Sequence, residues 1–481
     1  MSAEQVPAAS FAPTPRSGVV LGMSWPQLVL VVVGLVPTLA RFMAQDLGGA
    51  LRTAIGLSVP VCVFAVGRWG GRSLLTRTVT VGVFVVRRLL GQTRMTVDPS
   101  AVREQGRIGV PGAAGERLRT LSLVGTRYAG GAFLWDRAAR TGTVVLRMTT
   151  YGWALISTSE KIARVQAFDE MCKGLAEQAG VARVTTHART YPATAGEPVQ
   201  AEVGSWVEAE YADAVRMGES TRPVHRDVLL TVSVDRSAVR EEVAQAGGGK
   251  VGLSAVLADR VASLLAFLPQ CGVRPEDAAW LSESQLRGVV RLGFDPAAAD
   301  WLWAAGGRLP ADAVLASVVE EHSDHLVTDS GLHKTFWVER WPAEPTPAAY
   351  LADVVGTGRY VHTVTQMWVP VPRHESDRRL RSARQAHRGI QNLSERIGRE
   401  MSSDMEAEGA ELELRRAELA AGYGDVRYTG LVTISAGDAA ELKTAAVKLR
   451  QDTPGSTLNP LRGQQYAAFL TSLPLGLGLR R

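Results

Sequence analysis

The sequence predicts an α+β protein: an N-terminal transmembrane helical hairpin followed by two split α/β sandwich-like (ferredoxin-like) halves with a long helical insertion. Three observations predict it: two uncharged apolar runs near the N-terminus, an alternation of strand-like and helix-like segments that repeats after Leu332, and a highly charged stretch inside the repeat. The chain has 481 residues, 46% of them hydrophobic and 21% charged. It is long enough for two or three domains and too apolar to be disordered throughout.

The first apolar run has no charge between Arg16 and Arg41, and its only polar residues after Trp25 are Gln27 and Thr38. About 20 helical residues cross a hydrocarbon core of ~30 Å. We therefore expect a transmembrane helix over about 19–41, after a flexible segment 1–18. The alternative is a cleaved signal peptide, which is disfavoured because the run is long and no Ala-x-Ala site ends it.

The second run, Thr53 to Gly67, is shorter and lies between Arg52 and Arg68. It reaches spanning length if the side chain of Arg52 snorkels to the membrane surface, since the residues before it are also apolar. A second helix over about 48–67 then closes a hairpin that occupies 19–67. A re-entrant or interfacial segment is the alternative.

Positive charge is concentrated in residues 1–100, which hold nine arginines, no lysine and three acidic residues, whereas the whole chain has a net charge of +5. Six of these arginines follow the second apolar run: Arg68, Arg72, Arg77, Arg87, Arg88 and Arg94. Arginine-rich flanks stay in the cytoplasm, so we expect a multi-pass protein of the cell membrane with both termini cytoplasmic. Over 68–95 we expect an amphipathic helix on the inner leaflet, with a strand pair or a third spanning helix as alternatives.

The remainder reads as a linker over 96–117, a first α/β region over 118–330 and a second over 331–481 with a long charged helix 376–421. Apolar residues at three- and four-residue spacing predict helices, and runs rich in β-branched residues predict strands. Two β-like runs, 118–134 and 143–157, open the first region. The further predicted strands are 181–190, 225–234, 334–341, 360–369 and 426–435, with a final short strand near 457–461. The other predicted helices are 159–179, 203–218, 251–267, 276–292, 347–355 and 438–450.

No segment carries a recognisable catalytic pattern. The run Gly247–Val251 lacks the hydroxyl residue that a phosphate-binding loop needs after its lysine. His322 and His325 lack the HExxH spacing and an evident third ligand, and the three cysteines show no paired spacing. We therefore expect no cofactor, no metal and no enzymatic activity, with a membrane-bound enzyme that uses no phosphate-binding loop as the remaining alternative.

The long charged helix carries four closely spaced arginines, Arg378, Arg379, Arg381 and Arg384. We expect them to dock a protein partner. A solvated helix face is the alternative, as is contact with lipid or nucleic acid. Because residues beyond 100 are almost neutral overall, direct nucleic-acid binding is not indicated.

The order of hairpin, arginine-rich helix and α/β region resembles a type IV secretion (conjugation) component of actinobacteria. The segments that carry the resemblance are the long helix Arg378–Glu418, Trp341-Pro342 after a strand, and the closing run Gly463–Gly476 (GQQYAAFLTSLPLG). The hairpin looks like the two-helix inner-membrane subunit of such machines, fused to the N-terminal, non-catalytic domain of the conjugation ATPase. In that ATPase the closing run leads toward the nucleotide-binding domain, whereas this sequence ends at Arg481.

The resemblance implies an inner-membrane scaffold subunit of a type IV secretion or conjugative transfer machine that anchors a separate cytoplasmic ATPase. It implies the secretion ATPase, other inner-membrane secretion subunits and membrane lipid as partners, with self-association left open. It carries over no catalytic residues. A membrane subunit of a type VII secretion machine is the alternative, because such subunits also pair a hydrophobic hairpin with an α/β domain.

Overall fold

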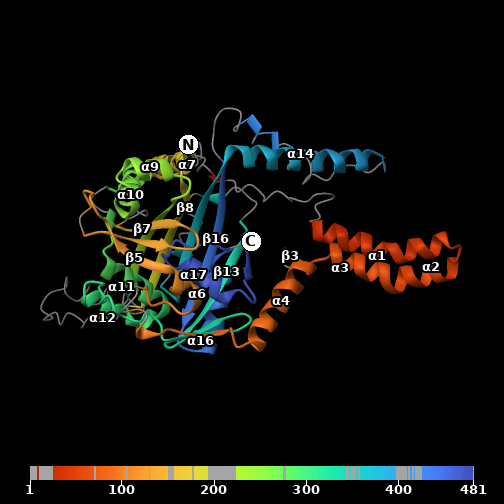
Figure 1. Cartoon of the computed structure of the whole chain (residues 1–481), viewed down its shortest axis with the longest axis horizontal. Coiled ribbons are helices and arrows are strands. Elements are labelled where there is room, and N and C mark those ends of the chain that lie inside the picture. Colours follow the sequence, from red (N-terminus) through yellow and green to blue (C-terminus); the bar gives the residue numbers. More distant parts are fainter. Residues whose placement is uncertain are drawn as a thin grey trace, which may run out of the picture. The chain divides into compact units, whose positions relative to one another are not determined.

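The computed structural model describes residues 8–9, 25–69, 72–100, 102, 107–128, 130–149, 156–175, 178–192, 224–274, 278–341, 346–347, 354–355, 358–396, 409, 412–413, 416–417 and 425–479 (Figure 1). They form two units. One comprises Met1–Ser10, Arg87–Pro370 and Val426–Arg481, and is called the α/β unit below. The other comprises Phe11–Val86 and Val371–Asp425.

The N-terminal hairpin consists of α1 (Trp25–Met43) and a second helix built from α2 (Leu47–Thr53), the π-helical turn η1 (Ala54–Ser58) and α3 (Val59–Val66). The two helices run antiparallel and pack along their length (Figure 1). The side chain of Asp46 accepts a 2.8 Å hydrogen bond from Gly49 N and so caps α2. The prediction of two apolar helices is confirmed, and residues 19–24 lie outside the described part of the chain.

A shorter helix than predicted follows the hairpin. Strands β2 (Arg68–Trp69) and β3 (Arg72–Ser73) pair with each other, and α4 covers Leu74–Leu89. Ser73 Oγ accepts a hydrogen bond from Thr76 N and starts α4. Residues 94–95, predicted to end the helix, instead belong to β4 (Arg94–Thr96), which pairs with β11 (Val318–Glu321) in the large sheet.

The long charged helix is described over α14, Arg373–Arg396. Between Arg396 and Asp425 only residues 409, 412–413 and 416–417 are described, all of them helical. Most of the predicted range 376–421 past Arg396 therefore lies outside the described residues, as do the predicted helix 203–218 and most of 347–355.

The α/β unit is built on a sheet of 13 strands. Its order is β4-β11-β12-β13-β16-β15-β8-β9-β7-β6-β5, with β10 on β7 and β17 on β13. The further strands are β5 (Leu118–Ser122), β6 (Ala132–Asp136), β7 (Thr141–Met148), β8 (Val181–Pro192), β9 (Val224–Asp235), β10 (Ala278–Trp280), β11 (Val318–Glu321), β12 (Leu326–Thr328), β13 (Leu332–Arg340), β15 (Val361–Val371), β16 (Asp425–Ala436) and β17 (Thr457–Pro460). A separate two-residue pair joins β1 (Ala8–Ala9) to β14 (Thr346–Pro347).

Strands from both predicted α/β regions share this one sheet. Strand β15 of the second region pairs antiparallel with β8 of the first, with Thr365 opposite His187. Each pairing within the sheet whose register is described is antiparallel. The structure thus combines helices with one large antiparallel sheet. The boundary predicted between residues 330 and 331 does not separate two sheets.

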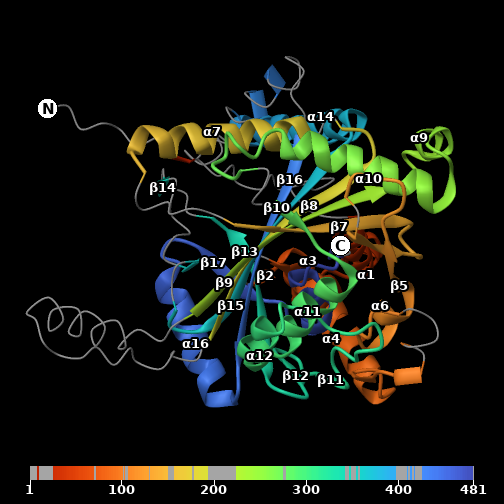
Figure 2. The same ribbon diagram turned by 90° about the vertical axis from the view of Figure 1, so that its left-hand side faces the viewer.

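Helices cover both faces of the sheet (Figure 2). They are α6 (Gly112–Arg117), α7 (Thr158–Leu175), α9 (Arg240–Gln245), α10 (Gly249–Leu265), α11 (Glu283–Phe294), η4 (Pro296–Ala298), α12 (Ala299–Ala304), α16 (Ala439–Asp452) and α17 (Gln465–Ser472). The strands sort their side chains between the faces with a period of two. Val144 and Leu146 pack with residues of α10, whereas Val145 between them packs with residues of α11 and α17.

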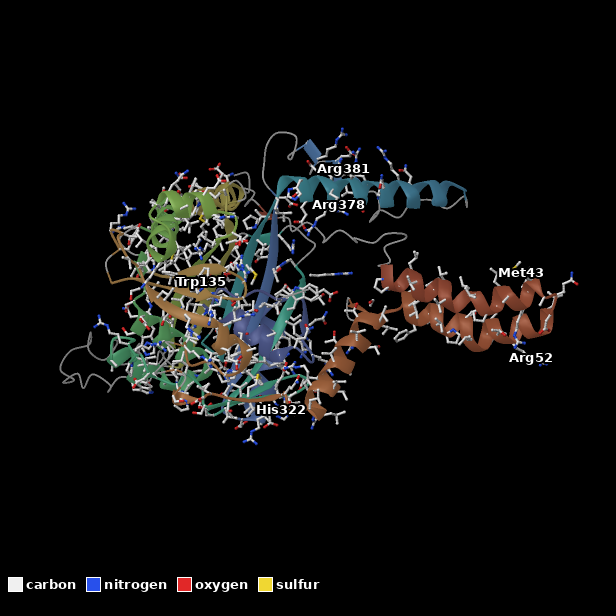
Figure 3. All side chains as sticks on the ribbon, in the orientation of Figure 1. Met43, Arg52, Trp135, His322, Arg378 and Arg381 are labelled. Carbon is white, nitrogen blue, oxygen red and sulfur yellow. The ribbon has the colours of Figure 1, made fainter. Side chains whose placement is uncertain are left out.

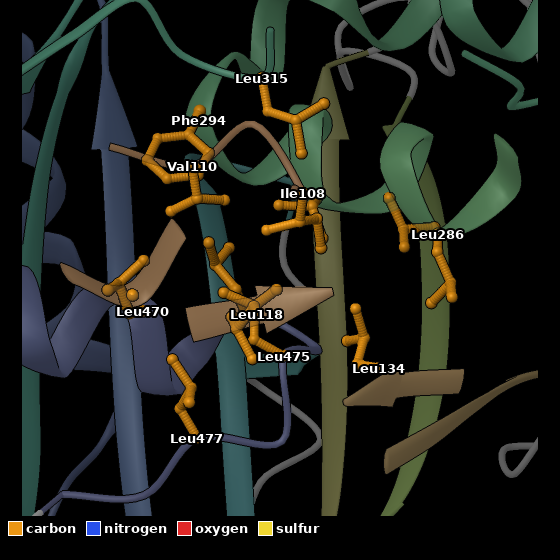
Figure 4. Packing of buried hydrophobic residues seen from close by; sticks show 14 of the residues in the cluster. Ile108, Val110, Leu118, Leu134, Leu286, Phe294, Leu315, Leu470, Leu475 and Leu477 are labelled. Carbon is orange, nitrogen blue, oxygen red and sulfur yellow. The ribbon is translucent and has the colours of Figure 1, made fainter. Parts of the chain in front are cut away.

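Residues 107–117, in the predicted linker, contribute to the core. Ile108, Val110 and Ala114 are buried in the cluster that α11 and α17 form with the sheet (Figure 4). These apolar positions lie among glycine and charged residues, so the composition of the segment did not indicate that they are buried. Backbone contacts hold this segment at the sheet edge, because β4 pairs with β11 and Gly109 O accepts a hydrogen bond from Leu315 N.

The closing run is also buried. Gln465 has no exposed surface; its side chain accepts a hydrogen bond from Thr335 N at 2.9 Å and donates to Thr335 O and Leu461 O. Phe469 and Leu473 pack in the same core cluster as α11. A glutamine that satisfies the backbone of a central strand in this way fixes the start of α17 on the sheet.

Candidate membrane anchor and its arginines

The polar groups of the hairpin point at the partner helix. Gln27 Nε2 donates to Ala65 O at 2.7 Å. Ser58 Oγ donates to Gly34 O at 2.5 Å, so Thr38 Oγ1 must be the donor in its 2.7 Å contact with Ser58 Oγ. The two polar residues that interrupt the first apolar run thus make interhelical hydrogen bonds, as polar residues of transmembrane helices do.

A close approach of the two helices accompanies these bonds. A Cβ at Gly34 would lie 2.7 Å from Val61 Cγ1, a distance that real side chains do not adopt. Small residues at such crossings let helix backbones come near enough for van der Waals contact and interhelical hydrogen bonds. Gly34 therefore has a structural reason to be glycine.

The outward side chains of the hairpin are apolar. More than half of the surface of Val33, Leu39 and Leu51 is exposed, and further exposed members are Val29, Val32, Leu35, Val36, Ile55, Leu57, Val59, Val63 and Val66. Pro26–Met43 and Leu47–Val66 are long and apolar enough to cross a membrane, with 18 and 20 residues. At 1.5 Å per residue these lengths correspond to about 27–30 Å, the thickness of a hydrocarbon core.

Charge lies at the loop end of the hairpin. Arg41 and Asp46 form an exposed ion pair at 3.4 Å, and Arg52 follows in the last turn of α2. Figure 3 shows Met43 and Arg52 at this end. The hairpin therefore has an uncharged middle and a charged loop, the distribution expected of a helix pair that meets water only at its ends.

Helix α4 is apolar on most of its exposed surface. Among its described side chains only Phe84 is buried, while Val79, Val81, Val83, Val85, Val86 and Leu89 are exposed. Thr78 and Thr80 direct their hydroxyl protons to the carbonyl oxygens of Leu74 and Thr76, one turn earlier. These internal hydrogen bonds remove polar groups from the surface, which suits contact with an apolar environment.

The six arginines after the hairpin do not share one environment. The backbones of Arg68 and Arg72 lie in β2 and β3, and Arg77 lies near the start of α4. Arg88, in the last turn of α4, and Arg94, in β4, are exposed. These placements leave lipid contact open for the exposed members of the set.

Arg87 departs from the prediction of a lipid-facing residue. Its Nη2 lies 2.9 Å from Oε2 of Glu321, a carboxylate whose side chain is only 1% exposed. Glu321 Oε1 also accepts a hydrogen bond from Tyr466 N at 3.1 Å. Sequence reasoning missed Glu321. Its only local signal is that it is one of two adjacent acidic residues, Glu320 and Glu321, and the sequence does not show that it falls on the inward side of a short strand.

The four predicted docking arginines lie in the first turns of α14. Arg378, Arg379 and Arg381 are exposed, and Figure 3 labels Arg378 and Arg381 on this helix. Arg379 forms an ion pair with Glu375, and Arg384 forms one with Glu413 at 2.8 Å. Two of the four charges are therefore matched within the chain, and Arg378 and Arg381 are the exposed members without a carboxylate partner in the described residues.

The other candidate groups lie on separate elements. Lys250 is the second residue of α10 (Gly249–Leu265), and Val251, in the position of the missing hydroxyl, is exposed. The rings of His322 and His325 stack at 4.6 Å in the turn between β11 and β12. No group of three or more His, Cys, Asp or Glu side chains able to hold a metal occurs among the described residues.

Comparison with known proteins adds no relative: no protein-family model and no curated protein sequence matches this chain.

Proposed function

We propose that this protein is an inner-membrane scaffold subunit of a type IV secretion or conjugative transfer machine. The observation that carries the membrane part is the hairpin, whose polar side chains bond across the helix pair while its apolar side chains face outward. Such an arrangement is stable where hydrocarbon replaces water around the helices. The machine and its ATPase rest on the resemblance of the closing run and the long charged helix.

The proposed orientation places the loop at Asp46 outside the cytoplasm and both termini inside. Its support is the arginine-rich stretch after the hairpin, opposed to a loop with Arg41, Arg52 and one acidic residue. Exposed Arg88 and Arg94 then lie at the leaflet that carries anionic lipid, within reach of its negative surface potential. The protein would be multi-pass, with the α/β unit in the cytoplasm.

The proposed partner is a separate cytoplasmic ATPase docked by α14. Support comes from Arg378 and Arg381, exposed cations on a helix that is polar on most of its surface. The finer division of the α/β unit into two ferredoxin-like halves belongs to the same proposal. It is supported by the order of strands and helices in each half of the sequence and by the resemblance to the non-catalytic ATPase domain.

Two measurements test the proposal. The full chain should sediment with membranes and resist carbonate extraction, and recovery as a soluble protein without detergent would contradict the anchor. Affinity purification of the full chain from membranes of its own cells should recover a phosphate-loop ATPase. Reversing Arg378, Arg379, Arg381 and Arg384 to Glu should reduce that recovery in a salt-dependent way, because exposed charges are screened within ~8–10 Å at physiological salt.

A matched control reverses four exposed arginines of the α/β unit to Glu: Arg127, Arg137, Arg236 and Arg308. Equal loss of the ATPase from both variants would overturn the role of α14. ATP turnover by the purified chain that disappears with Lys250→Ala would replace the scaffold by an enzyme. Recovery of a type VII secretion ATPase would favour that alternative machine.

A further inference from the structure

Two buried arginines face one buried aspartate at the ends of β7, β8 and β9. Arg189 on β8 lies directly opposite Asp227 on β9, and both are 2% exposed. Arg147 on β7 holds the same aspartate, with Nε 2.9 Å from Oδ1 and Nη2 3.5 Å from Oδ2. Asp227 thus serves two guanidinium groups and makes its close hydrogen bonds with only one of them.

Two neighbouring carboxylates have partners of their own. Asp295 is bound to Arg291 at 2.6 Å, and Asp300 is bound to His225 at 3.1 Å. Arg147, Arg189 and Asp227 thus place two guanidinium groups beside one carboxylate. Burial and the charge of Arg147 lower the pKa of Arg189 to about 10, although the charge of Asp227 acts in the opposite direction. The guanidinium of Arg189 is therefore still a cation at neutral pH.

Aromatic residues close the group on two sides. The guanidinium carbon of Arg189 lies 4.9 Å from the ring centre of Tyr191, and that of Arg147 lies 4.8 Å from the ring centre of Trp303. His225, which is opposite Tyr191 on β9, stacks on Trp303 at 5.6 Å. These contacts bring Arg189, Tyr191, Arg147 and Trp303 to one place, here called the arginine–tryptophan cluster.

Four buried donor atoms of this cluster have no hydrogen-bond partner: Nη1 and Nη2 of Arg189, the hydroxyl of Tyr191 and Nε1 of Trp303. Buried polar atoms are almost always satisfied, and each exception needs a physical explanation, such as ordered water or a bound ion. All four can donate protons, and two guanidinium groups lie beside one carboxylate. The missing group is therefore an acceptor, and a guanidinium fork matches the geometry of an oxyanion.

We propose that the arginine–tryptophan cluster binds a small inorganic oxyanion of the phosphate type. Arg189 supplies the charge and a pair of parallel N–H groups, and Tyr191 and Trp303 supply neutral donors. A carboxylate on a bulky partner would not reach the donors, because all four atoms are shielded from solvent.

The test is titration of the full chain in detergent with inorganic phosphate at constant ionic strength, with chloride as the comparison ion. Phosphate should bind with a stoichiometry of one per chain in calorimetry. It should raise the melting temperature with the logarithm of its concentration above Kd, by on the order of 3 °C at 100 times Kd. Chloride should give neither a binding isotherm nor such a rise. Arg189→Met should abolish the phosphate response, while Arg308→Met, which changes an exposed arginine, should keep it.

Two conservative variants keep the test informative if Arg189→Met fails to fold. Tyr191→Phe and Trp303→Phe each keep an aromatic ring and remove one donor, and each should weaken phosphate binding about tenfold, the loss expected for one hydrogen bond to an anion. An equal phosphate response in the wild type and Arg189→Met, or no phosphate response in the wild type, would overturn the proposal and assign the donors to ordered water.

Discussion

Arg87 Nη2 lies 2.9 Å from Glu321 Oε2, which joins the last turn of helix α4 to a buried carboxylate in β11. The same carboxylate accepts Tyr466 N at the start of α17, and Glu321 N donates to Thr93 O. One residue therefore ties the exit of α4 to the closing run.

Removing this carboxylate should destabilise the α/β unit. Glu321→Ala leaves Tyr466 N without its acceptor and Arg87 without its counter-ion. A buried donor left without an acceptor costs about 1–3 kcal/mol, and the remaining charge of Arg87 is partly solvated. Glu320→Ala, at the exposed neighbour, should change the free energy of unfolding by less than about 0.5 kcal/mol. Urea unfolding of the two variants, followed by tryptophan fluorescence, measures both. Equal losses would show that the ion pair does not stabilise this junction.

Long elements of the fold were predictable and the contacts between distant segments were not. Strands 181–190, 225–234 and 426–435 match β8, β9 and β16, because long runs of β-branched residues carry their own signal. The three- and four-residue strands β10 and β11 exist only through their partners, so local patterns missed them. The predicted helix 276–292 accordingly begins later, at Glu283 after the Ser282 capping box.

The same limit applied to the candidate sites. Gln27 and Thr38 were visible as polar interruptions of an apolar run, and both proved to bond across the hairpin. Arg189 and Glu321 gave no such signal, because a charged residue in a strand is ordinarily a surface residue. Their burial depends on segments distant in the sequence: Arg189 lies opposite Asp227 of β9, and Glu321 contacts Arg87 and Tyr466 N.

The packing of the hairpin predicts a difference between two glycines. Gly34→Leu must displace Val61 and separate the helices, whereas nothing lies within 4 Å of a Cβ at Gly56. Backbone amides of α1 and α3 should exchange hydrogen for deuterium faster in detergent-solubilised Gly34→Leu, because helix opening becomes easier. Gly56→Leu should exchange like the wild type. Faster exchange in both would mean that leucine itself, rather than the helix contact, causes the effect.

The proposed orientation predicts the behaviour of reporter fusions. A reporter that is active only outside the cytoplasm should be silent after Thr96 and active when inserted at Asp46, because arginines hold their side of the membrane in the cytoplasm. Changing exposed Arg88 and Arg94 to Glu should lower the activity at Asp46 by mixing the two orientations. The reverse pattern in the wild type would place the α/β unit outside and exclude a cytoplasmic ATPase as its partner.

Two buried histidines predict a loss of stability in acid. Burial, reinforced by the charge of Arg189, lowers the pKa of His187 to about 3, and burial lowers the pKa of His333 to about 4. Both are neutral in the folded state from pH 5 to 6.5, where the unfolded chain takes up protons at its ordinary pKa of about 6.5. Their contribution is thus complete above pH 6.5 and declines below it, by up to about 1.4 kcal/mol per pH unit for each histidine.

Unfolding free energies measured between pH 5 and 7 check this. His187→Gln and His333→Gln should each reduce the pH slope by about one proton while lowering the stability at pH 7 to different extents. A slope that stays the same in both variants would mean that other groups cause the acid sensitivity.

The closing run predicts the last difference, between Gly476 and Gly306. Both have a positive φ, +64° and +69°, so an added Cβ strains either backbone by about 1–2 kcal/mol. At Gly476 the Cβ would also lie 2.2 Å from Thr143 Oγ1, whereas nothing lies within 4 Å at Gly306. Thr143 has little room to yield, since it is buried and its hydroxyl contacts Ser233 Oγ at 2.8 Å.

Gly476→Ala should therefore lower the free energy of unfolding by about 1–3 kcal/mol more than Gly306→Ala, the usual cost of overpacking a filled site. Urea unfolding of both variants in the same detergent gives the comparison without any correction for the shared backbone strain. Thr143→Ser removes the methyl group but keeps the hydroxyl, and in combination with Gly476→Ala it should restore part of the lost stability. Equal losses of unfolding free energy in the two glycine variants would mean that the residues after α17 do not pack against the sheet. The closing run would then be free to move, as a connection toward another domain requires.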